Sequence, residues 1–325
     1  MARVLITGGS GFIGTNLVER YLRLGHSVRA VDIVAPRQPG HLPHYRAVDL
    51  RDAKALRSVA AEFEPELVFH LGARTDLRGR ALADYAANTE GVANMVRTVN
   101  ELPGVRLAVF ASSMLVCRLG YVPQREDEYC PTSAYGQSKA EGEAIVRRLA
   151  AERLPWLIVR PTSIWGPWFG PPYRDLFDAI QRGFYAQPRG LQVRRSYGFV
   201  LNTVHQLHEL GRCGGGELLG RAIYLADEQP TELVEWIQLI KTALGRRRLR
   251  ELPMPLFVAA ARLGDALAAL GVRRFPMSTR RLQNMMTDAV YDTQPIHTVA
   301  GPDPHSLQAA VALTCEWLAR QRVVA

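Results

Sequence analysis

Tyr135 and Lys139 have the types and the spacing that redox chemistry at an alcohol needs. They stand at positions i and i+4, so on a helix their side chains lie on one face, one turn apart. A free phenol has a pKa of about 10, too high for a base at neutral pH, and a neighbouring ammonium group lowers that pKa. The pair could therefore move a proton on a substrate hydroxyl while a hydride leaves the same carbon atom.

Two serines follow the strand predicted over 107–111. Ser112 and Ser113 come directly after its last residue, Ala111. In parallel sheets with helices on both faces, ligands bind at the carboxyl ends of the strands. A serine at that edge can orient the reacting hydroxyl or ketone, so we expect the serines and the Tyr–Lys pair to form one site.

A glycine-rich turn joins the first predicted strand to the first predicted helix. It reads Thr-Gly-Gly-Ser-Gly-Phe-Ile-Gly over 7–14, and its N–H groups could approach a pyrophosphate at the positive end of the helix. Asp32 ends the next strand, where a carboxylate accepts hydrogen bonds from ribose hydroxyls and repels a 2′-phosphate. These features predict NAD in preference to NADP, while Arg29 and Arg37 are close enough in sequence to keep NADP open.

The first half of the chain alternates apolar strands with helical periodicity, which is typical of an α/β fold with a doubly wound parallel sheet, the Rossmann type. After Pro161 the alternation stops, and helical segments follow around 231–244, 256–270 and 306–321. We expect an NAD-binding Rossmann domain over 1–165, rejoined by part of 196–226, and a smaller, mostly helical substrate-binding domain over 166–325. The predicted buried strands are Val4–Thr7, Val28–Asp32, Leu67–Leu71, Leu107–Ala111 and Leu157–Arg160.

The charge balance favours a small phosphate-bearing partner over nucleic acid. The chain has 325 residues with 40 Lys and Arg against 31 Asp and Glu, a formal net charge of +9. Guanidinium groups match phosphate oxygens, although most of these arginines are expected on a solvated surface. No zinc, helix-turn-helix or RNA-binding motif accompanies the charge, so we predict no nucleic-acid partner.

The cysteines and the N-terminus bear on the compartment. Cys117, Cys130, Cys213 and Cys315 have no metal-ligand spacing, so we predict no metal site and expect idle thiols in a reducing compartment. The N-terminus runs straight into a strand with no signal-peptide pattern. A cytoplasmic location is expected.

The most apolar later segment, Leu252–Leu270, is interrupted by Pro255, Arg262 and Asp265, so we predict no transmembrane segment. Its part 256–270 could rest on a membrane surface, because arginines flank it. The interpretation we favour is an amphipathic helix that packs the small domain. The flanking arginines are Arg248, Arg250, Arg273 and Arg274.

Together these motifs resemble the extended short-chain dehydrogenase/reductases of the NAD-dependent epimerase/dehydratase family. The likeness is specific for the superfamily and much less so for a substrate. The matching segments are TGGSGFIG at 7–14, Asp32, Asp49-Leu50, His70-Leu71-Gly72-Ala73, Asn88-Thr89, Ser112-Ser113, YGQSK at 135–139, and Arg160-Pro161-Thr162 through Gly166-Pro167.

The resemblance implies roles that spacing alone does not identify. By that likeness Ser113 is the catalytic serine beside Tyr135 and Lys139, and Lys139 also holds the nicotinamide ribose. Asp49 and Leu50 would flank the adenine. The implied cofactor-binding residues are Gly8, Gly11, Phe12, Ile13, Gly14, Asp32, Asp49, Leu50, Leu71, Gly72, Ala73, Asn88, Tyr135, Lys139 and Pro161.

The chain also departs from the family. Met114 and Leu115 stand where dehydratase members place an Asp-Glu pair, so dehydratase chemistry is not expected. Met114 also replaces a Cys that many 4-keto-sugar reductases use. Arg195 matches the arginine that grips a substrate diphosphate, and Ser163 replaces a common Asn. The implied substrate-binding residues are Ser112, Ser113, Ser163 and Arg195.

The leading prediction is an NAD-dependent epimerase that acts on a nucleotide-diphosphate sugar. It would oxidise the C4 hydroxyl with Tyr135 as acid and base, let the keto sugar turn, and return the hydride to the other face. A one-way dehydrogenase or reductase, on a nucleotide sugar or a sterol-like alcohol, is the first alternative. A non-catalytic NAD-binding regulator is the other, and the intact Ser113, Tyr135 and Lys139 set argues against it.

The resemblance also implies a homodimer, built from the helix after Asn88 and the helix through Tyr135 of each copy. The sequence permits this pairing through apolar positions on both helices, namely Val92, Val96, Ala140 and Ile145.

Overall fold

The computed structural model describes residues 1–246, 250–271, 275 and 277–323. The chain divides into two compact units. The first unit comprises Met1–Trp168, Tyr197–Glu228 and Asp292–Pro304, and the second comprises Phe169–Ser196, Gln229–Tyr291 and His305–Ala325. The stretch 292–304, which we expected in the smaller domain, belongs to the first unit.

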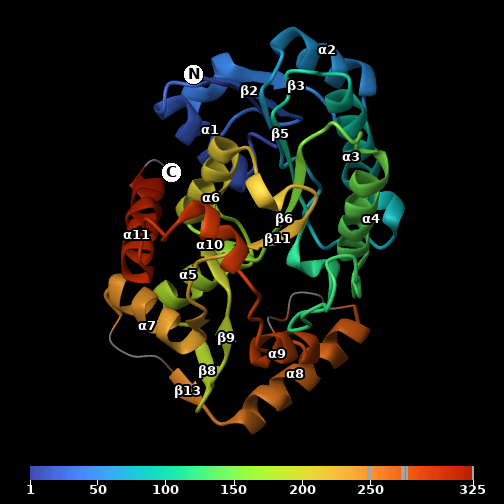
Figure 1. Ribbon diagram of the computed structural model, residues 1–325. Helices are drawn as coiled ribbons and strands as arrows, with labels where there is room; N and C mark the ends of the chain where they lie inside the picture. Colours follow the sequence, from blue (N-terminus) through green and yellow to red (C-terminus); the bar gives the residue numbers. More distant parts are fainter. Residues whose placement is uncertain (247–249, 272–274, 276, 324–325) are drawn as a thin grey trace. The chain divides into compact units, whose positions relative to one another are not determined.

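A seven-stranded sheet forms the centre of the first unit (Figure 1). Its strand order is β11-β6-β5-β4-β1-β2-β3, and every neighbouring pair is parallel. The order reverses between β1 and β4, and ligands of such sheets bind at this switch point. The strands are β1 Arg3–Thr7, β2 Ser27–Asp32, β3 Tyr45–Ala47, β4 Leu67–His70, β5 Leu107–Ala111, β6 Trp156–Pro161 and β11 Ala222–Leu225.

Helices cover both faces of this sheet because alternate strand residues are apolar on both sides. Val4 and Ile6 join one buried apolar cluster with α1 and α6, whereas Leu5 joins the other with α2, α3 and α4. Strands that are buried on both faces read as continuous apolar runs, which is the pattern seen in the sequence. The helices are α1 Phe12–Arg23, α2 Ala53–Phe63, α3 Ala86–Asn100, α4 Ala134–Leu149, α6 Val200–Cys213 and α10 Gln294–Ala300.

The doubly wound Rossmann architecture predicted from the sequence is confirmed. Two strands of the sheet were not predicted: β3 is short and its Arg46 is exposed, while β11 returns to the sheet after a long excursion. The first unit also holds a two-stranded parallel pair, β7 Ser163–Trp165 and β10 Tyr197–Phe199.

The apolar positions that suggested a dimer interface lie inside the first unit. Val92, Val96, Ala140 and Ile145 are all buried in the single chain. Val92, Val96 and Ile145 belong to the apolar cluster between the sheet and α2, α3 and α4, and Ala140 packs in a separate cluster with Val116 and Cys117. They are therefore core residues of the single chain, and the homodimer through α3 and α4 stays a prediction.

The second unit is mostly helical, with short strand pairs β9–β12 and β8–β13. The helical segments predicted after Pro161 are present as α7, α8 and α11. Among the described residues, no helix is long and apolar enough to cross a membrane. The elements are α5 Tyr173–Arg182, β8 Ala186–Pro188, β9 Arg194–Arg195, β12 Thr231–Glu232, α7 Leu233–Ala243, β13 Arg250–Leu252, α8 Met254–Ala269, α9 Thr279–Met286 and α11 Leu307–Val323.

Candidate active site

The turn between β1 and α1 requires glycine for steric reasons. Gly8 has φ +69°, and a Cβ there would come within 2.6 Å of the backbone nitrogen of Gly72. A Cβ at Gly14 would lie 2.0 Å from the carbonyl oxygen of Gly8. The Gly11 N–H donates to the same oxygen at 2.9 Å. The three glycines therefore create a turn whose backbone a large anion can approach closely.

The start of α1 fits a pyrophosphate. Gly11 is its N-cap, and no side chain caps the first turn, which begins with Phe12 and Ile13. Uncapped N–H groups at a helix N-terminus form a binding site for phosphate. These residues therefore fit the diphosphate of a dinucleotide, and the absence of side chains at Gly8, Gly11 and Gly14 leaves room for it.

Asp32 ends β2 beside this turn. Its carboxylate accepts hydrogen bonds from the N–H groups of Ser10 at 3.1 Å and Val34 at 3.2 Å. Arg37 donates from Nε to the Ser10 carbonyl at 2.9 Å and from Nη1 to the Trp168 carbonyl at 2.6 Å. Because the guanidinium group is bound to backbone and faces the Asp32 charge, it is poorly placed to receive a 2′-phosphate. The arrangement supports NAD over NADP.

The loop after β4 carries three of the residues expected along the cofactor, Leu71, Gly72 and Ala73. Asn88, fully buried, accepts from the Arg74 N–H at 2.8 Å and donates to the Arg74 carbonyl at 3.0 Å and to Ser138 Oγ at 2.9 Å. Both of its N–H donors are thus used within the protein. Asn88 positions this loop, which is an indirect role in place of the direct contact we expected.

The residues expected around the adenine lie at the end of β3. The Leu50 side chain is buried and fills the space beside Gly72, where an added Cβ would lie 2.7 Å from it. Asp49 forms an ion pair with Arg51 at 2.6 Å. The carboxylate of Asp49 is therefore already engaged, while Leu50 offers the apolar surface.

Ser113 and Tyr135 meet at the carboxyl end of β5. Ser113 is the N-cap of the short helix Met114–Val116, and its Oγ accepts from the Leu115 N–H at 3.1 Å. Tyr135 lies in the first turn of α4, which Ser133 caps. The Ser113 hydroxyl lies near enough to the Tyr135 phenol to lower its pKa. The structure thus brings the predicted serine and tyrosine together.

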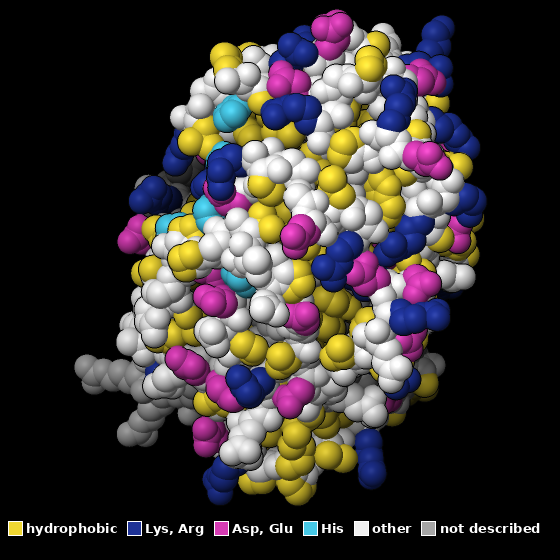
Figure 2. All heavy atoms as spheres, in the orientation of Figure 1, with side chains coloured by type: hydrophobic (Ala, Val, Ile, Leu, Met, Phe, Trp, Pro, Cys, Tyr) yellow, Lys and Arg dark blue, Asp and Glu magenta, His cyan; other side chains and the backbone are white. Residues whose placement is uncertain are grey.

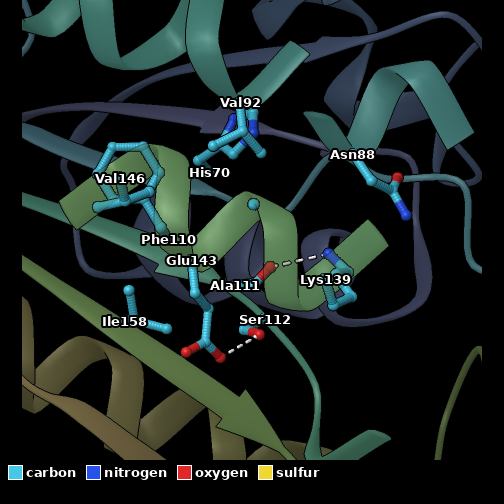
Figure 3. A pocket seen from close by; sticks show the side chains of 11 residues that line it. His70, Asn88, Val92, Phe110, Ala111, Ser112, Lys139, Glu143, Val146 and Ile158 are labelled. Atoms are coloured by element: carbon cyan, nitrogen blue, oxygen red, sulfur yellow. Dashed lines mark hydrogen bonds between the residues drawn. The ribbon is translucent and has the colours of Figure 1, made fainter. Parts of the chain in front are cut away.

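Lys139 lies one turn after Tyr135 on α4, as the spacing predicts. Its Nζ donates to the carbonyl oxygen of Ala111 at 2.8 Å, the last residue of β5 (Figure 3). Burial lowers the pKa of Lys139 to about 8, against an opposing contribution from Glu143. The ammonium group is therefore close to losing its proton near neutral pH.

The expectation that Lys139 lowers the pKa of Tyr135 was wrong for this state of the protein. Burial raises the pKa of Tyr135 to about 12, while the nearby Ser113 hydroxyl acts in the opposite direction. The Tyr135 side chain is buried, so removal of water outweighs the favourable contact. Tyr135 is therefore a protonated phenol, ready to donate a proton, until a substrate and a cationic nicotinamide are bound.

A small cavity lies between β5 and α4, with about 10 Å³ of room for the centre of a water molecule, enough for one. Lys139, Ser112 and Asn88 lie around it (Figure 3). His70 also lines it: Nδ1 is hydrogen-bonded to Thr7 Oγ1 at 2.9 Å, while Nε2 is buried without a partner in the described residues. Burial and the nearby Lys139 charge lower the pKa of His70 to about 3, so the imidazole is neutral.

Behind the serines lies a buried ion pair that the sequence reasoning missed. Glu143, one turn after Lys139, accepts from Arg160 Nε at 2.8 Å and Nη2 at 2.7 Å, and both side chains are 1% exposed. Ser112 donates to Glu143 at 2.5 Å, and Tyr129 donates at 3.1 Å. The acidic partner raises the pKa of Arg160 against the effect of burial. The i+4 spacing from Lys139 to Glu143 was the available signal.

These contacts change what Ser112 can do. Its hydroxyl points into the protein and is committed to Glu143. Its donor is therefore used internally, and binding of the substrate by Ser112 stays a prediction. Pro161 is the last residue of β6 and Ser163, which is buried, is the first residue of β7.

Arg195 lies in the second unit, on β9. Its guanidinium group donates to the carbonyl oxygens of Asn284 and Thr287, at the C-terminus of α9. Cations stabilise that end of a helix. Binding of a substrate diphosphate by Arg195 remains a prediction. Among the described residues, no group of three or more His, Cys, Asp or Glu side chains could hold a metal ion.

The chain matches a family model and many known proteins. The model of the NAD dependent epimerase/dehydratase family matches residues 4–202. The chain is 28% identical over 271 residues to the 3-beta-hydroxysteroid dehydrogenase of Mycolicibacterium neoaurum, covering 76% of this chain and 71% of that relative. It is 24% identical to the N-acetyl-alpha-D-glucosaminyl-diphospho-ditrans,octacis-undecaprenol 4-epimerase of Escherichia coli O157:H7, over 97% and 94% of the two chains.

The solved structures show the same fold. The UDP-glucose 4-epimerase of Thermotoga maritima, solved with UDP-glucose, superposes with a TM-score of 0.74 at 18% identity, over 98% of this chain and 99% of that one. The family match covers the glycine turn, Asp32 and the Ser113, Tyr135 and Lys139 set. The chain therefore belongs to the NAD-dependent epimerase/dehydratase family, and NAD is its cofactor.

Proposed function

We propose that this enzyme is an epimerase that inverts C4 of a nucleotide-diphosphate sugar. The observation that carries the proposal is the placement of Ser113, Tyr135 and Lys139: Ser113 is near enough to the phenol to affect its pKa, and Lys139, one turn after Tyr135, is bonded to the end of β5. Met114 and Leu115, the next residues after Ser113, have no acid or base to expel a hydroxyl group. This set supports reversible oxidation of an alcohol without elimination.

In the proposed mechanism, Ser113 holds the C4 hydroxyl and Tyr135 accepts its proton. The glycine turn and Asp32 would hold NAD, which would supply the acceptor and later the donor of the C4 hydride. Lys139 lies one turn after Tyr135 with its Nζ on the Ala111 carbonyl, so its charge would stabilise the phenolate that accepts this proton and that forms again when Tyr135 gives the proton back. After the keto sugar turns, Tyr135 gives the proton back.

One further contact belongs to the proposal. Arg195 would bind the substrate diphosphate, which requires its guanidinium group to exchange at least one helix carbonyl for phosphate oxygens. The relatives support a diphosphate-bearing sugar: one is named as an epimerase of a diphospho-linked N-acetylglucosamine, and the structural neighbour was solved with UDP-glucose. Both ligands present a sugar on a diphosphate.

A one-way alcohol dehydrogenase is the second candidate. The relatives named as 3-beta-hydroxysteroid dehydrogenases, at 28% identity over 271 residues, favour it. The same Ser113, Tyr135 and Lys139 set would serve, but the cofactor would have to be exchanged in every cycle. The substrate would then be a flat, apolar alcohol with no need for a diphosphate contact.

The experiment is to incubate the enzyme with UDP-hexoses and UDP-N-acetylhexosamines without added cofactor and to follow C4 stereochemistry by NMR. Interconversion of C4 epimers with no free NADH supports the epimerase. Activity with a sterol-like alcohol alone, with one NADH released per turnover, would replace it with the second candidate.

A further inference from the structure

The helix α8 of the second unit presents apolar side chains to solvent along one side. We name as the outer stripe Leu256, Ala259, Leu263, Ala266 and Leu270, which recur at intervals of three and four residues and are all exposed. The leucines are the large side chains of this apolar surface: Leu256 is 54% exposed, Leu263 53% and Leu270 80%. Residues at this spacing share one face of a helix.

The opposite side of α8 already has its packing partners. Phe257 and Ala261 are buried with Leu282 of α9 in one apolar cluster. Gly264 sits so close to the neighbouring chain that a Cβ there would lie 1.8 Å from the Met277 carbonyl oxygen. The side of α8 that carries Phe257, Ala261 and Gly264 therefore packs against the rest of the unit. The outer stripe takes no part in that packing.

The favoured interpretation of this segment, a helix that only packs the small domain, was therefore incomplete. Single exposed leucines are ordinary on protein surfaces, but a periodic stripe is not. The space-filling view shows hydrophobic side chains gathered at the lower end of the molecule, over α8 (Figure 2). A stripe of this kind marks a surface that binds an apolar partner.

The charge around the stripe identifies the partner's chemistry. Among the described residues of 246–281, five arginines are exposed, and Asp265, one of the two acidic residues with Glu251, is engaged with Thr279. These arginines are Arg246, Arg250, Arg262, Arg280 and Arg281. Arg248, Arg273 and Arg274, which we expected beside this segment, lie outside the described residues.

We propose that the outer stripe of α8, with the arginines around it, docks the enzyme on the surface of an anionic lipid membrane. An amphipathic helix inserts its apolar side at the level between headgroups and acyl chains, and basic residues beside it bind anionic headgroups. At about 1.5 Å per residue, the 16 residues of α8 lie along roughly 24 Å of membrane surface. A second copy fits less well, because two such faces would bring their arginines together.

The test uses the full-length protein and vesicles of two compositions, phosphatidylcholine alone and phosphatidylcholine with phosphatidylglycerol. The expected result is co-sedimentation with the anionic vesicles only, weakened by added salt because exposed charges are screened. Leu256→Ser with Leu263→Ser should lower vesicle affinity by about tenfold or more, since two inserted leucines are lost. The matched control is Leu24→Ser with Leu42→Ser, which replaces two equally exposed leucines of the first unit.

Thermal unfolding of both double variants checks that each is folded, because the altered side chains are exposed and contribute little to packing. The proposal would be overturned if the wild-type protein did not co-sediment with anionic vesicles. So would an α8 variant that binds them as tightly as wild type. Light scattering without lipid is the last check. A wild-type dimer that becomes a monomer on the α8 substitutions would show that the outer stripe binds a second copy of the chain instead of a membrane.

Discussion

The Nζ of Lys139 donates to the carbonyl oxygen of Ala111 at 2.8 Å, and this bond joins α4 to the end of β5 two residues before Ser113. It fixes the position of α4, which carries Tyr135 and Lys139, relative to the end of β5, after which Ser113 lies. The bond uses only one of the three N–H donors of the ammonium group, so Lys139 keeps two donors and its charge for bound ligands. Bound substrate and NAD must therefore lower the pKa of Tyr135 before the phenol can act as a base.

Replacing Tyr135 by Phe should lower turnover by roughly 10²–10⁴, the loss expected for an acid–base group. NAD affinity should stay nearly unchanged, because the ring and its packing are kept. Steady-state kinetics and calorimetric titration of NAD measure the two effects. Wild-type turnover in Tyr135→Phe would remove Tyr135 from the mechanism.

Replacing Asp32 by Ala should narrow the preference for NAD over NADP, because a carboxylate at the ribose repels a 2′-phosphate. Arg37 should not by itself create NADP binding, since two of its nitrogens are bound to backbone carbonyls. Titration of both dinucleotides against wild type and Asp32→Ala tests this. A wild type that binds NADP more tightly would show that Asp32 has been assigned the wrong role.

His70 should make the protein sensitive to acid. Burial lowers its pKa to about 3 in the folded state, so the unfolded chain binds more protons below about pH 6.5 and stability falls as the pH falls. The expected loss from this group is about 2 kcal/mol of unfolding free energy between about pH 7 and about pH 5. His70→Gln should flatten that slope in urea unfolding. An unchanged slope would mean that His70 is protonated in the folded protein.

The buried ion pair gives a prediction on stability. Glu143→Leu should cost about 3–5 kcal/mol of unfolding free energy, because the Arg160 charge is left buried without its partner. The double variant Glu143→Leu with Arg160→Met should recover much of that loss, since neither charge remains. Urea unfolding of wild type, both single variants and the double variant completes the cycle. Additive losses would show that the two groups do not depend on each other.

The fold and the cofactor turn could be predicted because they depend on local pattern. Apolar runs between helical segments predict parallel strands. The positive φ of Gly8 and the close approach at Gly14 both require glycine, so the residue type itself reveals the turn. The short strand β3 and the returning strand β11 were missed, since pairing with distant residues decides them. Their own residues, such as exposed Arg46, carry a weak signal.

The site was predictable in its members and less so in its electrostatics. Tyr135 and Lys139 follow from spacing, but their pKa values depend on burial, which spacing does not give. Whether Ser112 or Ser113 faces the reaction depends on Glu143, whose partner Arg160 comes from another strand. Contacts of this kind form only when the chain is folded, so sequence reasoning did not find them.

The most direct test of the proposed epimerase follows the hydride itself. A UDP-hexose carrying deuterium at C4 is incubated with the enzyme, and the product and free cofactor are examined by NMR and mass spectrometry. We expect a C4-inverted sugar that keeps its deuterium at C4, because NAD that stays bound would return the deuteride that it accepted, while Tyr135, with Lys139 beside it, would return only the hydroxyl proton. Deuterium in released NADH, with a keto sugar as the product, would contradict it.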